Sequence, residues 1–186
     1  MQTRHIHISG LVQGVGFRPF VCRVAREMGM AGWVCNSNDG IHIEFNANET
    51  NAFKFYNYLL GHLPDNAIIT SHSIGVTDQK EFDSFTIKKS INLSSPDLIV
   101  TPDIAICPEC RQEVLNQDNR RYHYPFTTCL KCGPRYSILK QLPYDRENTT
   151  MANLPMCNHC MAEYQDIQNK RHFSQTNTCP QCAIPM

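Results

Sequence analysis

The chain has 186 residues, 41% of them hydrophobic, so it can form one domain of ordinary size or two small ones. It carries 17 basic and 17 acidic residues, and this balance excludes a bulk electrostatic attraction to nucleic acid or to a membrane surface. No run of eighteen apolar residues occurs, so no membrane-spanning helix is expected. The first residues lack the charged and apolar regions of a secretion signal, so we expect a cytoplasmic protein.

The first part of the chain, residues 1–90, alternates between strand and helix patterns. Ile6 and Ile8 fall on one face of an alternating run, which predicts a strand over residues 4–9. The spacing of apolar residues and the turn residues between them predict the following further elements: helices over 19–28 and 51–63, and strands over 31–35, 41–45, 68–76 and 82–87. The order βαββαβ plus one extra strand predicts an α+β fold, a ferredoxin-like sandwich.

The second predicted helix has an apolar stripe that indicates which of its faces is buried. Asn51 is its expected N-terminal cap, and Pro64 is expected to end it. The stripe consists of Phe53, Tyr56, Leu59, Leu60 and Leu63. Two such helices on one face of an antiparallel sheet can bury a single core.

A glycine-rich turn, Gly10-Leu-Val-Gln-Gly-Val-Gly-Phe-Arg18, joins the first predicted strand to the first helix. Glycines let the backbone curl tightly, so several amide N–H groups can point at one centre. The positive end of the helix and the planar donors of Arg18 suit a phosphate. The turn lacks the Lys-Ser/Thr pair of a Walker loop and the spacing of a dinucleotide fingerprint. It therefore predicts an anion-binding loop, with a plain glycine turn and a surface arginine as the alternative.

The second part of the chain is an internal repeat, which follows a predicted linker over residues 91–106. Each repeat has the form Cys-x2-Cys-x18-Cys-x2-Cys, in a first finger over 107–132 and a second over 157–182, joined by a segment over 133–156. The eight cysteines are Cys107, Cys110, Cys129 and Cys132, then Cys157, Cys160, Cys179 and Cys182. Other residues also coincide between the repeats: Glu113 and Glu163, Asn119 and Asn169, Arg121 and Arg171, Thr128 and Thr178. Duplication is the simplest account.

Paired thiolates at this spacing are typical of structural zinc. A Cys-x-x-Cys turn places two sulfurs on one side of the ion, and the second pair completes a tetrahedron with no open position for catalysis. The pattern predicts two zinc ions bound in a reducing cytoplasm, in preference to disulfides. A thioredoxin-like redox pair is the rival, but its βαβ context is absent. The spacing leaves open whether each ion takes its ligands from one repeat or from interleaved pairs.

The other candidate ligands are assigned no metal. Each repeat already has four sulfurs, so His123, His159 and His172 are expected to lie on the surface. Cys22 and Cys35 are expected to fill the core of the first part of the chain.

Motifs in both parts of the chain resemble known families. The turn from Gly10 to Arg18 resembles the acylphosphatase signature at every position, and Gly32-Trp-Val-Cys-Asn-Ser-Asn-Asp-Gly40 resembles that family's second motif. Gly16-Phe-Arg-Pro-Phe20 is typical of the acylphosphatase-like domain that opens the hydrogenase-maturation carbamoyltransferases, the HypF family. The zinc-finger region that follows in that family resembles three segments here, at residues 101–107, 124–136 and 142–151. The resemblance covers nearly the entire chain.

The resemblance implies roles for residues of the first part. Arg18 and the loop amides of Gln13, Gly14, Val15, Gly16 and Phe17 would bind the phosphoryl group. Asn36 would orient a water for in-line attack at phosphorus, with no metal, covalent nucleophile or base, because the acyl group already leaves well. The alternative for Asn36 is a hairpin-turn residue, and Asn38 could take either part.

Two large nucleotide-handling domains follow in the HypF family, which activate the carbamoyl group as an adenylate and pass it to a cysteine of a partner protein. Here the sequence stops four residues after Cys182, so we expect either a fragment or a truncated gene product. Carbamoyl transfer is therefore not assigned to this chain alone.

The sequence supports two functions of different classes. The first is an acylphosphatase, which hydrolyses carbamoyl phosphate or another acyl phosphate during synthesis of the cyanide ligands of [NiFe] hydrogenase, with the carbamoyl-accepting maturation protein as its partner. The alternative is a binding module whose loop holds an anion and whose zinc units dock onto other domains or another protein. A nucleic-acid zinc ribbon ranks third, because the repeats hold acidic residues beside basic ones and no basic stripe. No membrane partner is expected.

Overall fold

The computed structural model describes residues 1–91, 99 and 102–182. It divides into two compact units: the first comprises Met1–Gln13 and Phe17–Val100, and the second Gly14–Gly16 and Thr101–Met186. Much of the predicted linker, at residues 92–98, 100 and 101, lies outside the described residues. Among the described residues, no helix has the length and apolar character needed to cross a bilayer.

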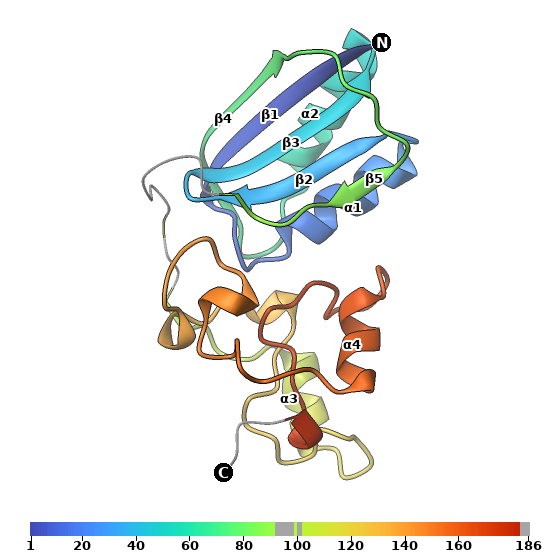
Figure 1. Ribbon diagram of the computed structural model, residues 1–186. Helices are drawn as coiled ribbons and strands as arrows, with labels where there is room; N and C mark the ends of the chain where they lie inside the picture. Colours follow the sequence, from blue (N-terminus) through green and yellow to red (C-terminus); the bar gives the residue numbers. More distant parts are fainter. Residues whose placement is uncertain (92–98, 100–101, 183–186) are drawn as a thin grey trace. The chain divides into compact units, whose positions relative to one another are not determined.

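The first unit is a five-stranded sheet with two helices on one face (Figure 1). The strand order is β4-β1-β3-β2-β5, in which only the β2–β5 pair is parallel. The strands are β1 (Gln2–Leu11), β2 (Gly32–Ser37), β3 (Gly40–Ala47), β4 (Ile68–Val76) and β5 (Phe85–Ile87). The helices are α1 (Phe17–Glu27) and α2 (Glu49–Gly61). The predicted α+β, ferredoxin-like fold is confirmed, with β5 as the extra strand.

Alternation along the two central strands decides which side chains form the core. Ile6 and Ile8 of β1 and Ile41 and Ile43 of β3 are fully buried. Burial of such a side chain contributes about 1.5–3 kcal/mol, so this face of the sheet supplies much of the stability of the first unit. The intervening residues of both strands face away from the helices.

Helix α2 begins earlier than its sequence pattern indicates, and it buries a different face. Asn48 is the cap, and its side chain accepts a hydrogen bond from the backbone amide of Asn51 at 2.8 Å. The buried residues are Ala52, Phe55 and Leu59, whereas Phe53 is 43% exposed. Of the expected stripe only Leu59 is fully buried, and the placement of Phe53 in it was wrong. The ring of Phe55 packs edge-to-face on Phe45 of β3, with centroids 5.0 Å apart, and this contact orients the helix.

The second unit repeats one backbone plan twice. Helix α3 (Pro108–Leu115) and helix α4 (Asn158–Gln165) each begin directly after the first cysteine of a repeat. Short 3-10 turns, η1 (Leu130–Cys132) and η4 (Pro180–Cys182), contain the last cysteine of each repeat. Two further 3-10 turns lie between the repeats: η2 (Tyr136–Ile138) and η3 (Arg146–Asn148). The left-handed residues His123 and Phe173, both with φ of 56°, occupy equivalent positions, so the duplication extends to the backbone.

Candidate active site and metal centres

The glycine loop between β1 and α1 has the conformation that its composition predicts. Gly14 and Gly16 have φ of 72° and 81°, in the left-handed region that glycine adopts without strain. The Gln13 side chain is buried, and its Nε2 donates to the carbonyl oxygens of Ser37 at 2.6 Å and Gly40 at 3.0 Å. Gln13 therefore holds the start of the loop against the β2–β3 hairpin. Its backbone amide stays a predicted phosphate ligand.

Arg18 lies in the first turn of α1, and its side chain is only 8% exposed. Its guanidinium donates to the hydroxyl of Ser90 over 3.4 Å. Burial of a charged guanidinium costs free energy unless an opposite charge or hydrogen bonds compensate it. A bound anion would provide this compensation for Arg18. This is not the surface arginine of the alternative interpretation, and its position at the helix start suits an anionic ligand.

Asn36 lies in strand β2, where it pairs with Ile41 of β3. The turn of the hairpin consists of Asn38 and Asp39, so the turn interpretation of Asn36 was wrong. Asn36 is 1% exposed, and among the described residues neither its side-chain oxygen nor its side-chain nitrogen has a hydrogen-bond partner. A buried unpaired polar group costs about 1–3 kcal/mol. Such an exception in a folded protein calls for a ligand, a water or a functional explanation.

The paired cysteines of the second unit gather into two clusters. Cys107, Cys110, Cys129 and Cys132 form the first cluster, and Cys157, Cys160, Cys179 and Cys182 form the second. Within each cluster the four sulfur atoms all lie within 4.8 Å of one another. Each cluster is drawn from a single repeat, which resolves the question of interleaved ligands for the described residues.

Sulfur–sulfur distances within the clusters test whether they fit a metal. They are 3.6 Å for Cys107–Cys129, 3.8 Å for Cys129–Cys132 and 3.7 Å for Cys157–Cys179. A tetrahedral zinc with Zn–S bonds of about 2.3 Å holds its sulfurs about 3.8 Å apart. Both clusters therefore have the size of C4 zinc-finger sites.

Comparison with known proteins covers both units. The Acylphosphatase family model matches residues 4–87, and the HypF finger model matches residues 106–139 and 156–186. The chain is 41% identical over 184 residues to the carbamoyltransferase HypF of Rhodobacter capsulatus, an alignment that covers 98% of this chain. The chain belongs to the HypF family.

Solved structures and shorter relatives agree with this assignment. A crystal structure of full-length HypF in the phosphate- and nucleotide-bound form matches 98% of this chain with a TM-score of 0.90 and 37% identity, and the match covers 24% of that protein. An acylphosphatase of Thermotoga maritima is 37% identical over 91 residues, which are 47% of this chain and 98% of that relative. The chain spans 24% of the length of the Rhodobacter capsulatus HypF.

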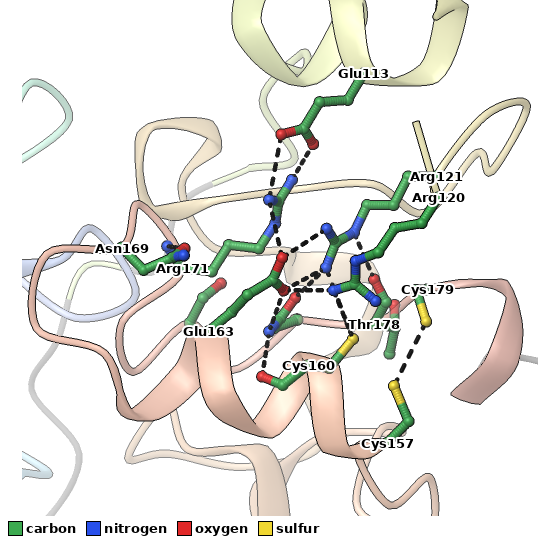
Figure 2. Close-up of polar contacts among 12 residues, drawn as sticks. Glu113, Arg120, Arg121, Cys157, Cys160, Glu163, Asn169, Arg171, Thr178 and Cys179 are labelled. Carbon is green, nitrogen blue, oxygen red and sulfur yellow. Dashed lines mark hydrogen bonds and ion pairs between the residues drawn. The ribbon is translucent and has the colours of Figure 1, made fainter. Parts of the chain in front are cut away.

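Two buried arginines connect the repeats of the HypF finger region (Figure 2). Arg121 of the first repeat donates to Glu163 at 2.6 and 3.0 Å and to the sulfur of Cys160 at 3.7 Å. Arg171 of the second repeat donates to Glu113 and to the sulfur of Cys110 in the same manner. Each repeat thus supplies the cation that lies beside the other repeat's cysteine cluster.

Both arginines also donate hydrogen bonds to backbone carbonyl oxygens of the other repeat. Arg121 also donates to the carbonyl oxygen of Thr178, and Arg171 to that of Thr128, both at 2.9 Å. The sequence repeat already marked these positions as equivalent, but it did not indicate that they bond across the repeats. The available signal in the sequence was an arginine and a glutamate at equivalent positions in each repeat, close to the paired cysteines.

The carboxylate of Glu163 is held in its charged form by this network. Burial raises its pKa, but hydrogen bonds from Arg121 and Arg120 outweigh burial and lower the pKa from 4.5 to about 2. A carboxyl group with a lowered folded-state pKa stabilises the fold above its unfolded pKa. This contribution is therefore complete above about pH 4.5 and is lost as the pH falls toward about 2.

Replacement of Arg121 by methionine should destabilise the finger region by about 2–3 kcal/mol, because Glu163 and the Thr178 carbonyl lose charged hydrogen bonds. Thermal unfolding of the metal-loaded chain at pH 7, followed by hydrogen exchange in residues 102–182, measures the effect. Arg111→Met is the matched control, since Arg111 is an exposed arginine of α3. Equal stability of the two variants would show that the bonds of Arg121 across the repeats contribute nothing to the stability of the fold.

Proposed function

We propose that the first unit is an acylphosphatase that hydrolyses carbamoyl phosphate to carbamate and phosphate during hydrogenase maturation. The observation that carries this proposal is the Asn36 side chain, a buried amide with no hydrogen-bond partner in the part of the chain that the structure describes, on a strand against which α1 packs. A site that only holds phosphate has no use for this amide. A role in binding the attacking water explains why this amide is buried without a partner from the protein.

The proposed reaction needs positioning and charge, and the loop offers both. Arg18 and the backbone amides of residues 13–17 hold the oxygens of the phosphoryl group, assisted by the positive end of α1. The Asn36 oxygen accepts a hydrogen bond from a water molecule and thereby orients a lone pair of the water oxygen toward phosphorus. The water oxygen forms a bond to phosphorus while the bond to the carbamoyl oxygen breaks. The carbamoyl oxygen leaves as carbamate, and both water protons stay with the phosphate product.

The alternative function is a binding module, in which the loop holds the phosphate of a ligand and the finger region supplies a docking surface. The related full-length HypF has a crystal structure in a phosphate-bound form, which is compatible with either function. Asn36 separates them, because a holder of phosphate requires only Arg18 and the loop amides.

Replacement of Asn36 by alanine should lower kcat about 100-fold or more while inhibition by phosphate changes little, because the amide acts on the water and not on the anion. Steady-state rates on carbamoyl phosphate and benzoyl phosphate, together with the inhibition constant of phosphate, measure both quantities. Asn46→Ala is the control, since Asn46 lies in β3 of the same hairpin and its side chain is bonded to Thr3 and to the Lys80 carbonyl. Equal losses of turnover and of phosphate binding would mean that Asn36 only supports the strand.

We further propose the division of the chain into an acylphosphatase domain over residues 1–90, a linker over 91–106 and two fingers joined by residues 133–156. In this proposal each cysteine cluster holds one zinc ion, because four thiolates in a tetrahedron are the donor set that zinc prefers. Thiolate ligands need a reducing compartment, which supports the cytoplasm as the location. The fingers supply a surface for the maturation protein that accepts the carbamoyl group, and hydrolysis itself requires no metal.

A further inference from the structure

The face of the sheet that is turned away from the helices carries a row of histidines. His5 and His7 of β1 and His42 of β3 alternate with the core residues of their strands, so they lie together on this face. Their rings are stacked, with centroids 5.2 Å apart for His5–His42 and 4.5 Å apart for His7–His42. Asp39, in the turn before β3, lies at one end of the row. Neither the glycine loop nor the cysteine clusters include these residues.

The ring nitrogens and the carboxylate converge on a small volume. His42 Nε2 lies 3.0 Å from one carboxylate oxygen of Asp39, and His7 Nε2 lies 3.6 Å from the other. One donor atom from each of His7, Asp39 and His42 can be chosen so that all three lie within 4.8 Å of one another. A tetrahedral ion with bonds of about 2.0–2.1 Å to nitrogen and oxygen holds its donor atoms about 3.4 Å apart. The two distances from the Asp39 carboxylate, 3.0 and 3.6 Å, lie on either side of this value.

The neighbouring ring of His5 orients His42 toward the carboxylate of Asp39. His5 Nε2 lies 2.9 Å from His42 Nδ1, and this hydrogen bond leaves His42 Nε2 pointing to Asp39. Metal-bound histidines usually have such a partner on the second ring nitrogen.

The cluster is open to solvent on one side. The side chains of His7 and Asp39 are 29% and 25% exposed, and that of His42 is 9% exposed. An ion could enter from this side and keep one or more water ligands. His7 Nε2 also lies 3.2 Å from the backbone oxygen of Asp39 and 3.4 Å from the hydroxyl of Ser9, contacts that metal binding would replace.

We propose that His7, Asp39 and His42 form a third metal site, which binds a divalent ion such as Zn²⁺ or Ni²⁺ through two imidazoles and one carboxylate, with water completing the coordination. This donor set suits zinc, nickel and copper better than magnesium or calcium, which prefer oxygen ligands. The site is independent of the cysteine clusters, whose ligands are all sulfur. It is also independent of the proposed hydrolysis.

Isothermal titration with Zn²⁺ tests the proposal on the full chain whose cysteine clusters are already loaded with zinc. We expect one additional ion per chain. His42→Gln and Asp39→Asn should each lower the affinity for this additional ion by more than about 100-fold. This loss is larger than the 10–100-fold that is typical when a residue bonded to a ligand, and not the ligand itself, is replaced. His5→Gln should weaken binding of the ion within that 10–100-fold range. His72→Gln is the matched control, because His72 lies in β4 of the same sheet and bonds to Tyr56.

A second measurement identifies the ligands directly. In a chain with ¹⁵N-labelled histidines, Zn²⁺ should shift the ring nitrogens of His7 and His42, and Ni²⁺ should broaden them, while those of His62 and His72 stay unchanged. Circular dichroism of each variant confirms that it is folded. The proposal is overturned if the loaded chain binds no additional ion, or if His42→Gln binds it as tightly as the unaltered chain.

Discussion

Replacement of Arg18 by alanine should lower hydrolysis of carbamoyl phosphate and benzoyl phosphate by about 100- to 1,000-fold, the usual loss when one donor to a developing charge is removed. Arg18 is buried at the start of α1, where its guanidinium and the helix end carry the same sign. Removal of the side chain therefore leaves the phosphoryl group without its main counter-charge. Arg18→Lys should recover little of the rate, because an ammonium cannot make the two parallel hydrogen bonds of a guanidinium.

Two comparisons make this prediction specific. Arg23→Ala is the matched control, since Arg23 is an exposed arginine of the same helix and should leave the rate unchanged. Thermal unfolding of Arg18→Ala separates a loss of catalysis from a loss of folded protein. Activity equal to that of the unaltered chain in folded Arg18→Ala would eliminate Arg18 from the site and, with it, the proposed function.

Removal of metal should unfold residues 102–182 and leave hydrolysis nearly intact. Apart from the cysteines, the buried residues of the second unit are mainly polar, including Arg121, Arg171 and several threonines, so few apolar side chains leave water on folding. Structural zinc contributes about 10–16 kcal/mol to the folding of such small modules, which is more than their other interactions supply. The first unit has a continuous core between its sheet and helices, so we expect it to fold without metal.

Elemental analysis of the reduced protein, with hydrogen exchange before and after treatment with a strong chelator, measures both parts of this prediction. We expect at least two zinc ions per chain, with protection lost beyond the linker and retained in the sheet. A metal content near zero would refute the zinc assignment. Loss of hydrolysis together with the metal would show instead that the two units fold as one cooperative body, and would contradict the proposed domain division.

The fold of the first unit could be predicted because strand alternation and glycine positions are local signals. Ile6 and Ile8 mark the buried face of β1 without any knowledge of its partners. The buried face of α2 could not be predicted equally well, because the helix itself carries aromatic residues on several faces. Whether Phe53 or Phe55 is buried depends on the ring of Phe45, which lies in another strand. A helix with apolar residues on several faces leaves its orientation to tertiary contacts.

The candidate site shows the same division between local and tertiary information. The spacing of the cysteines was sufficient to predict two clusters, because each Cys-x-x-Cys turn is a local structure. The strand position of Asn36 depends on its pairing with Ile41, which no local pattern reveals. His172, expected on the surface, is 6% exposed, whereas the expected surface positions of His123 and His159 are confirmed.

Arg121 and Arg171, each of which bonds to the other repeat, indicate how the finger region arose. A single repeat would present the Glu113 carboxylate and the Thr128 carbonyl to an arginine that it does not itself place there, since Arg171 belongs to the other repeat. Contacts in which one copy's arginine meets the other's glutamate, and the reverse, are those of an isologous interface in a two-fold symmetric dimer. The finger region therefore has the organisation of a homodimer joined into one chain, and gene fusion would have converted a concentration-dependent association into an intramolecular one.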